Sequence, residues 1–306
     1  MKLVFILIGG LLFLSGCSDR ALTEKDLAPL RIGLMPTMDS VAIATAYELG
    51  LFEVHDVAVE LVPFASARDR DSAFIAGALD GATVDLIAVG LFNEGGIPTR
   101  ATSVTTAHFT LIAQADFDDL ASLKDGTVMI SHHTAIDFVL DAMLEAHGLA
   151  NDYVVREEVG NIPARFEMVR AGLAEAAVIS EPFATMAVVD GLAVITDTFL
   201  IDFNPFALAF SLEVIEERSA ELRAFYQAYL EAVEYLNESP MAKNLDRIVD
   251  LIGFPMEVVS YISMPTFLSP VVPEREIIEK ARDWLVEKGL ISVDTPLDDF
   301  IFDLKN

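Results

Sequence analysis

The feature that most constrains the fold is a repeated alternation of short apolar runs with helix-forming stretches. The run LRIGLM at 30–35 predicts a strand, 36–40 a turn, and VAIATAYELGLF a helix that ends at Gly50. A strand, a helix and a third strand then follow, at 57–62, 69–79 and 84–89. This spacing is typical of parallel strands with crossover helices, the unit of a doubly wound α/β lobe.

A second series of the same kind predicts a second lobe. Its strands are expected at 127–131, 153–159 and 176–180, and its helices at 135–147 and 162–171. From Leu212 onward the chain is mainly helical, because SLEVIEERSAELRAFYQAYLEAVEYLNE has a long helical periodicity. A hydrophobic content of 53% supplies enough apolar surface for two cores. The predicted fold class is therefore α/β, with two doubly wound lobes.

The N-terminus indicates export. Lys2 precedes an apolar run from Leu3 to Leu14, which is shorter than the roughly 20 residues that span a membrane. The following Ser15-Gly16-Cys17 completes a resemblance to the bacterial lipobox, which implies cleavage after residue 16 and a diacylated Cys17. We therefore expect a signal peptide at 1–16, an anchor and tether at 17–29, and an exported protein held at a membrane by this lipid.

Cys17 is the only cysteine in the chain. The alternative to a lipobox is an ordinary signal with an incidental cysteine. In either case the mature protein has no disulfide framework and no thiolate metal cluster. Stability must come from the apolar cores.

The charge is strongly acidic, with 20 Lys and Arg against 48 Asp and Glu, a net charge of -28. Such a surface repels nucleic acid and anionic lipid, so we expect no nucleic-acid partner. The charge by itself identifies no ligand.

Five segments occur in an informative order: PTMDSVAIATAYELGLFE, GALDGATVDLIAVG, DDLASLKDGTVMIS, AAVISEPFATMA and LRAFYQAYLEAVEYLNESP. In this order, behind a lipobox, they resemble the solute-binding proteins of the sulfonate, taurine, nitrate and thiamine-pyrimidine importers (the NMT1/THI5-like group). The resemblance covers nearly the whole mature chain. It implies a monomeric solute-binding lipoprotein that delivers a small molecule to an ABC permease and its ATPase.

The resemblance also implies a type II periplasmic-binding-protein fold with a two-crossover hinge. Lobe one is then expected at 30–112 plus 204–306, and lobe two at 113–203. The crossovers are expected near 113–119 and 198–204.

Ligands of open α/β sheets bind beyond the carboxyl ends of the strands, so the loops there supply the candidate residues. In the turn Pro36 to Ser40 the candidates are Asp39 and Ser40, at the start of a helix whose N–H groups can meet a polar group. The thiamine-pyrimidine relatives commonly have Pro-Asn-x-Asn-His here, and Thr37, Asp39 and Ser40 depart from that pattern. Plain N-capping is the alternative role for Asp39 or Ser40. After the third predicted strand the candidates are Phe92 and Asn93.

In lobe two the candidates are Ser131, His132 and Thr134 at the start of a helix. Adjacent histidines point apart, so at most one of His132 and His133 is expected to reach the cleft. Two neighbouring histidines without a third ligand at the right spacing are a poor zinc signal, and we expect neither a metal nor a cofactor.

The turn Glu181-Pro182-Phe183 resembles the Glu-Pro-aromatic turn of sulfonate and nitrate binders. It places Glu181 at the cleft edge as a hydrogen-bond acceptor, or else in solvent. At the return crossover the candidates are Asn204 and Phe206.

These loops carry Asp39, Glu94, Glu181 and Asp202 but no Lys or Arg. The tally favours a neutral or cationic nitrogen heteroaromatic, such as a thiamine-related pyrimidine, over a bare oxyanion, which usually requires an arginine. The alternative is a sulfonate, taurine or nitrate held by the N–H groups near Ser40 and Thr134.

Two other classes of protein compete with an importer component. Some proteins of this fold are cytosolic enzymes, which the lipobox and the lack of a nucleophile–base motif argue against, so no catalytic residue is expected. A tethered surface sensor is the second alternative.

Overall fold

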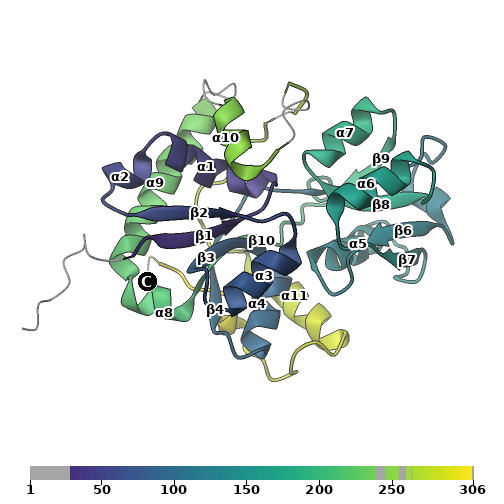
Figure 1. Cartoon of the computed structure of the whole chain (residues 1–306). Coiled ribbons are helices and arrows are strands. Elements are labelled where there is room, and N and C mark those ends of the chain that lie inside the picture. The colour runs from purple at the N-terminus through teal and green to yellow at the C-terminus, as the bar shows by residue number, and fades with distance from the viewer. Residues whose placement is uncertain (1–27, 239–244, 255–259, 263, 305–306) are drawn as a thin grey trace, which may run out of the picture.

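The computed structural model in Figure 1 describes residues 28–238, 245–254, 260–262 and 264–304. Two α/β lobes lie side by side and are joined by two crossover segments. The predicted signal peptide at 1–16, Cys17 and most of the tether lie outside the described residues.

Lobe one is built on a sheet of five described strands in the order β2-β1-β3-β10-β4. The bounds of these strands are β1 Leu30–Leu34, β2 Val59–Pro63, β3 Gly81–Asp85, β4 Thr99–Val104 and β10 Phe206–Ser211. Its helices are η2 Met38–Ser40, α1 Val41–Glu48, α2 Leu51–Val54, α3 Ala67–Ile75 and α4 Leu86–Glu94. Strands β1, β2 and β3 are parallel, and β10 runs antiparallel to β3 and β4.

Lobe two repeats this arrangement in the order β7-β6-β8-β5-β9. The bounds are β5 Phe109–Ala113, β6 Thr127–Ile130, β7 Val155–Glu158, β8 Ala176–Ser180 and β9 Ala193–Asp197. Its helices are η3 Leu120–Leu123, α5 Ala135–Ala146, α6 Ile162–Arg170 and α7 Phe183–Val189. The two sheets with flanking helices confirm the predicted α/β class.

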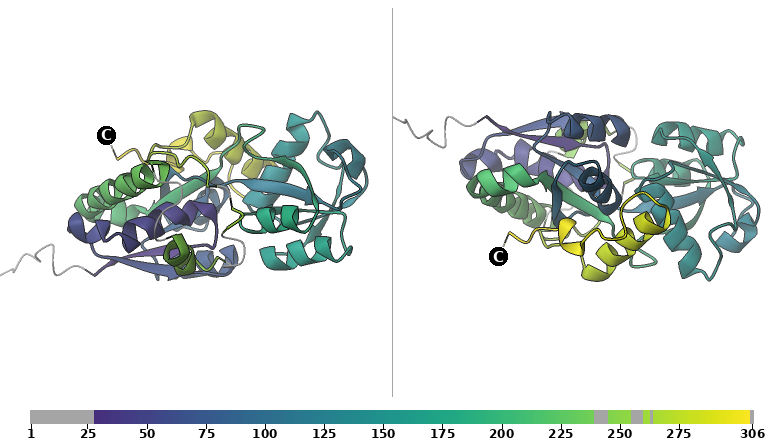
Figure 2. Two further views of the ribbon diagram at one scale, coloured as in Figure 1. Left: turned by 90° about the horizontal axis from the view of Figure 1, so that it is seen from above. Right: turned by 90° about the horizontal axis from the view of Figure 1, so that it is seen from below.

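The C-terminal third returns to lobe one. Its helices are α8 Leu212–Glu217, α9 Ser219–Glu238, α10 Leu245–Ile252, α11 Arg275–Glu287 and the short η5 Leu297–Asp299. The apolar face of α9 packs on α1 and α2, and α11 packs on α4. Figure 2 shows α11, in yellow, along one side of the molecule where the two lobes meet.

The first crossover lies earlier than the sequence indicated. Strand β5 pairs with β8 and β9 of the second sheet, so the chain passes between the lobes at 105–108 and not at 113–119. The apolar run 109–113 shows no local sign of which sheet it joins, because strand partners come from distant segments. The return crossover occupies 198–205, between β9 and β10.

The third strand also differs from the expectation. The segment 84–89 was expected to be a strand, but β3 ends at Asp85 and α4 begins at Leu86. The Asp85 side chain accepts a hydrogen bond from the Ala88 N–H at 2.9 Å and thereby caps the helix. A fully apolar helix shows no amphipathic period, so its residues resemble a buried strand.

Candidate functional site

Two adjoining cavities lie between the lobes at the carboxyl ends of the strands. The inner cavity has a volume of about 80 Å³ and the outer one about 690 Å³. Both are lined by Ser66 and Ala67 of lobe one and by Ser131, Thr134 and Gly160 of lobe two. Because both lobes contribute to each wall, this cleft is the candidate site.

The inner cavity has an apolar floor at the crossovers. Phe109 begins β5 and Phe206 begins β10, and their ring centroids are 4.9 Å apart at an angle of 45°. Met35, Val84 and Ile136 continue the apolar lining. An aromatic floor of this kind can support the body of a small organic molecule.

Arg70 on α3 is the cation of the inner cavity, and its side chain is buried. Its Nη1 donates to the Thr83 carbonyl at 2.8 Å, and its Nε and Nη2 donate to Asp71 Oδ1 at 2.9 and 2.7 Å. These bonds occupy three of the five N–H donors of a guanidinium. The other two have no acceptor among the described residues and are available to a ligand.

Arg70 lies outside the loops that follow the strands, where the sequence pattern placed the candidate residues. This residue lies in the first turns of α3, beyond the loop after β2, and α3 points its N-terminus at the cleft. As the fourth residue of α3, Arg70 extends its side chain over β3, where it reaches the Thr83 carbonyl.

Two carboxyl groups share the inner cavity with Arg70. Burial raises the pKa of Asp85 from its ordinary 3.8 to about 6, although the charge of Arg70 opposes the rise. Burial also raises the pKa of Asp39, which the hydrogen bond from Thr37 and then Arg70 oppose. The cavity therefore combines one permanent cation with two acids that ionise reluctantly.

The cleft also receives helix N-termini from both lobes. The Ser66 hydroxyl caps α3 by accepting from the Asp69 N–H at 3.2 Å, and the Thr134 hydroxyl caps α5 by accepting from the Ile136 N–H at 3.2 Å. The N-terminus of a helix has a partial positive charge that favours anions.

The structure brings together several of the predicted residues. Asp39, Ser131, Thr134 and Phe206 line the inner cavity, and His132 lines the outer one. The Ser131 hydroxyl and the His132 N–H both donate to the carboxylate of Glu158, at 3.4 and 2.6 Å.

The other predicted residues have internal partners. Ser40 is fully buried, and its hydroxyl accepts from the Met35 N–H at 3.2 Å beneath the cavity wall. Asn204 joins the crossovers, because its Nδ2 donates to the Thr105 carbonyl at 3.0 Å and its Oδ1 accepts from the Phe206 N–H. The hydrogen bonds of both residues are therefore made within the protein, to segments that line or adjoin the cleft.

Phe92 and Asn93 lie at the far end of α4, because this segment is helical. Phe92 stacks on Phe74 in the core, at 4.9 Å between ring centroids. Asn93 Nδ2 donates to the carbonyls of Val89, Thr99 and Asp299. Their expected position at the cleft was wrong.

The Glu181 side chain binds the first turn of helix α7. Its carboxylate accepts from the Thr185 N–H and the Thr185 hydroxyl, both at 3.0 Å, and its side chain is buried. It lines neither cavity of the cleft. The sequence could not show this, because Thr185 is one helical turn away and competes with any ligand for the same oxygens.

Arg165 of lobe two occupies the position that corresponds to Arg70. Each is the fourth residue of the helix that follows an edge strand, α3 after β2 or α6 after β7. Each donates to the carbonyl of the third residue of its sheet's central strand, Thr83 of β3 or Val178 of β8. Arg165 is fully buried and also donates to the Val159 carbonyl at 2.6 Å. Only Arg70 reaches the inner cavity.

Among the described residues, no three His, Cys, Asp or Glu side chains gather as a metal site would require. In the same part of the chain, no helix is long and apolar enough to cross a membrane.

Solved structures of periplasmic binding proteins share this fold at low sequence identity, which confirms the predicted fold. The alkanesulfonate-binding protein SsuA from Xanthomonas axonopodis pv. citri, bound to MOPS, is 16% identical and has a TM-score of 0.76, with 90% of this chain and 99% of that chain covered. The periplasmic aliphatic sulphonate binding protein SsuA from Escherichia coli is 17% identical with a TM-score of 0.75, and 90% and 92% are covered.

Sequence comparison gives a relative and a family. A putative ABC transporter periplasmic binding protein from Brachyspira hyodysenteriae is 22% identical over 259 residues, which are 77% of this chain and 73% of that protein. Residues 23–253, well over half of the chain, match the NMT1-like family. The chain therefore belongs to the NMT1-like family.

Proposed function

We propose that this protein is the solute-binding component of an ABC importer and that it captures one small molecule in the cleft between its lobes. The fold, the family and the Brachyspira relative support this role. The cleft supports it as well, because a ligand there contacts both lobes and can hold them together.

The ligand that the cleft favours is a small organic anion, such as a sulfonate. The observation that carries this proposal is Arg70, a buried arginine in the wall of the inner cavity with two free N–H donors. Two neighbouring N–H groups of a guanidinium match the geometry of a sulfonate or carboxylate. The N-termini of α3 and α5 add to the attraction, and Phe109 and Phe206 can hold the organic body.

A nitrogen heteroaromatic is the second candidate, and Asp39 and Asp85 favour it. Both carboxyl groups line the same cavity and can accept hydrogen bonds from ring or amino N–H groups. The loops lack Lys and Arg but the cleft does not, so their absence from the loops does not favour this candidate.

Calorimetric titration of taurine, alkanesulfonates, nitrate and aminopyrimidines against three variants separates the candidates. If the ligand is an anion, Arg70→Met should weaken binding about tenfold to a hundredfold, since a hydrogen bond to a charged group contributes about 1.5–3 kcal/mol. Arg223→Met is the matched control, because it removes the same charge from an exposed position of lobe one that lines neither cavity. Its effect should be less than about threefold.

The opposite pattern would support the heteroaromatic. An aminopyrimidine that binds tightly, loses affinity in Asp85→Asn and keeps it in Arg70→Met would overturn the anion proposal. If none of these compounds binds, mass spectrometry of the small molecule that co-purifies with the protein identifies the ligand class.

We also propose that Cys17 is the acylated N-terminus of the mature protein. Its position after Leu14-Ser15-Gly16 supports the proposal. Cys17→Ser should move the protein from the membrane fraction to the soluble fraction. Retention of the Cys17→Ser variant at the membrane would show that another anchor exists.

A further inference from the structure

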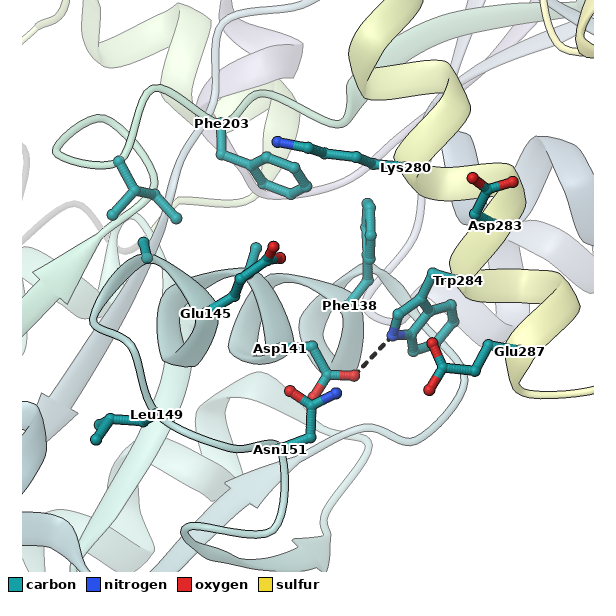
Figure 3. Close-up of a pocket in the computed structure, with 13 residues that line it drawn as sticks. Phe138, Asp141, Glu145, Leu149, Asn151, Phe203, Lys280, Asp283, Trp284 and Glu287 are labelled. Carbon is teal, nitrogen blue, oxygen red and sulfur yellow. Dashed lines mark hydrogen bonds between the residues drawn. The ribbon is translucent and has the colours of Figure 1, made fainter.

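A third cavity between the lobes, called the junction cavity below, lies away from the cleft. It has a volume of about 680 Å³ and is formed by α5 of lobe two, α11 of lobe one and the return crossover (Figure 3). None of its lining residues lines the inner or outer cavity of the cleft. The contacts at this cavity are therefore a separate junction between the lobes.

Asp141 of α5 is the polar centre of this junction. The Trp284 Nε1–H on α11 donates to Asp141 Oδ2 at 2.7 Å, as the dashed line in Figure 3 shows. Lys288, just after α11, places its Nζ 3.1 Å from the same oxygen. The other oxygen, Oδ1, pairs with Arg156 of lobe two. One buried carboxylate is thus held from both lobes.

Aromatic packing reinforces the junction. The Phe138 ring on α5 lies 5.5 Å from the Trp284 ring and 5.0 Å from the Phe203 ring of the crossover, between ring centroids. The buried apolar cluster here is continuous from α4 through α11 to α5. The lobes therefore adhere on this side through apolar as well as polar contacts.

The junction and the cleft lie on opposite sides of the return crossover. Phe203 of this crossover lines the junction cavity, whereas Phe206, directly after the crossover, lines the cleft. Helix α5 likewise presents Ala135 and Ile136 to the cleft, and it presents Asp141 and Glu145 to the junction cavity. A rotation about the crossovers that narrows the cleft must therefore move α5 away from α11.

We propose that the contact of Asp141 with Trp284 and Lys288 is an interlobe latch that opposes closure of the cleft and thereby lowers ligand affinity. The link to affinity rests on the proposed binding function, but the effect on the lobes does not. Ligand binding must break the latch, so the affinity reflects the free energy of the cleft contacts minus that of the latch.

The test measures the distance between the lobes without any ligand. Spin labels at Ala76→Cys, at the end of α3, and Glu157→Cys, on β7, are placed on exposed positions across the cleft. A Cys17→Ser background leaves these as the only thiols. Double electron–electron resonance then reports the distribution of distances between the labels.

Trp284→Phe is the informative variant, because it keeps a ring against Phe138 and removes the N–H donor together with one ring of the indole. The ratio of closed to open protein should rise about tenfold, seen as a shift toward shorter distances. Tyr226→Phe is the matched control. It removes one buried hydrogen bond of an aromatic residue, between the Tyr226 and Thr102 hydroxyls at 2.7 Å, that does not cross between the lobes.

The latch would be overturned if Trp284→Phe gave the same distance distribution as the wild type and Tyr226→Phe. Thermal melting must show in that case that the variant is folded. A shift to longer distances would also overturn the latch, because the contact would then favour closure. For any anion that binds the wild type, the affinity should rise in Trp284→Phe by the same factor as the closed population. If no tested anion binds, the proposal of an anionic ligand fails, while the distances still decide the latch.

Discussion

At the scale of single residues, the inner cavity of the cleft is defined by one arginine and two acids whose pKa values are raised. Arg70 is held by Asp71 and the Thr83 carbonyl, so its guanidinium is oriented before a ligand arrives. Such preorganisation reduces the entropy lost on binding. The acids Asp39 and Asp85 make the local charge depend on pH.

Asp85 should make the stability of the protein depend on pH. Burial raises its pKa from 3.8 to about 6, so the folded protein binds this proton more tightly than the unfolded chain does. The contribution of Asp85 is fully present below about pH 4 and is lost as the pH rises through about 6. Between about pH 4 and pH 7, the free energy of unfolding of the wild type should fall by about 2 kcal/mol more than that of Asp85→Asn. Urea unfolding at each pH measures this difference.

The asparagine keeps a side-chain oxygen for the Ala88 N–H, so the helix cap survives in this variant. Asp118→Asn, at an exposed position of lobe two, is the control and should follow the wild type. Parallel pH profiles for the wild type and Asp85→Asn would contradict the prediction.

At the scale of elements, α4 and α11 form the packed base on which the latch stands. Gly90 lies in the middle of α4, against Leu285 of α11 and the ring of Phe300. The absence of a side chain there lets the two helices approach closely. Position 90 therefore requires glycine for packing and not for an unusual backbone angle.

Gly90→Ala should destabilise the protein by about 1–3 kcal/mol, because a Cβ at this position would overlap the Leu285 side chain. Urea unfolding of the wild type and the variant measures the loss. Gly90→Ala combined with Leu285→Val tests the cause, since shortening the side chain relieves the overlap. The loss in the double variant should be smaller than the sum of the two single losses, and simple additivity would exclude the overlap.

At the scale of the whole molecule, the two lobes have corresponding parts with different tasks. Arg70 and Arg165 occupy the same place in the two sheets, yet one faces the cleft and the other binds Val159 and Val178 inside lobe two. The crossovers at 105–108 and 198–205 connect the lobes, while a shared apolar cluster joins α11 to α5 on one side.

A ligand that fills the cleft should draw the lobes together. Small-angle scattering should show a smaller radius of gyration on addition of the anion that binds best in calorimetry. Arg70→Met mixed with the same concentration of that anion is the control and should keep the radius of the free protein. An unchanged radius in a wild-type protein saturated with ligand would rule out closure about the crossovers.

Trp284 offers an independent signal, because it is the only tryptophan in the chain and its indole lies at the latch. Closure should expose the indole to water and shift its emission to longer wavelength. A saturating ligand that compacts the molecule without changing this emission would contradict the position of the latch.

The sequence by itself determined the α/β class, the two lobes and several walls of the cleft. The class and the lobes follow from local patterns, the periods of strands and helices. The loops after parallel strands meet at one edge of a sheet, and this rule located Asp39, Ser131, His132 and Thr134 in the walls of the cleft. Tertiary structure alone decided which sheet received β5 and that Arg70 enters the cleft from a helix. It also decided that Asp141 meets Trp284 across 143 positions of sequence. Contacts of this kind join elements that are distant in the chain, and their partners are selected by packing, so the local pattern of residues contains no record of them.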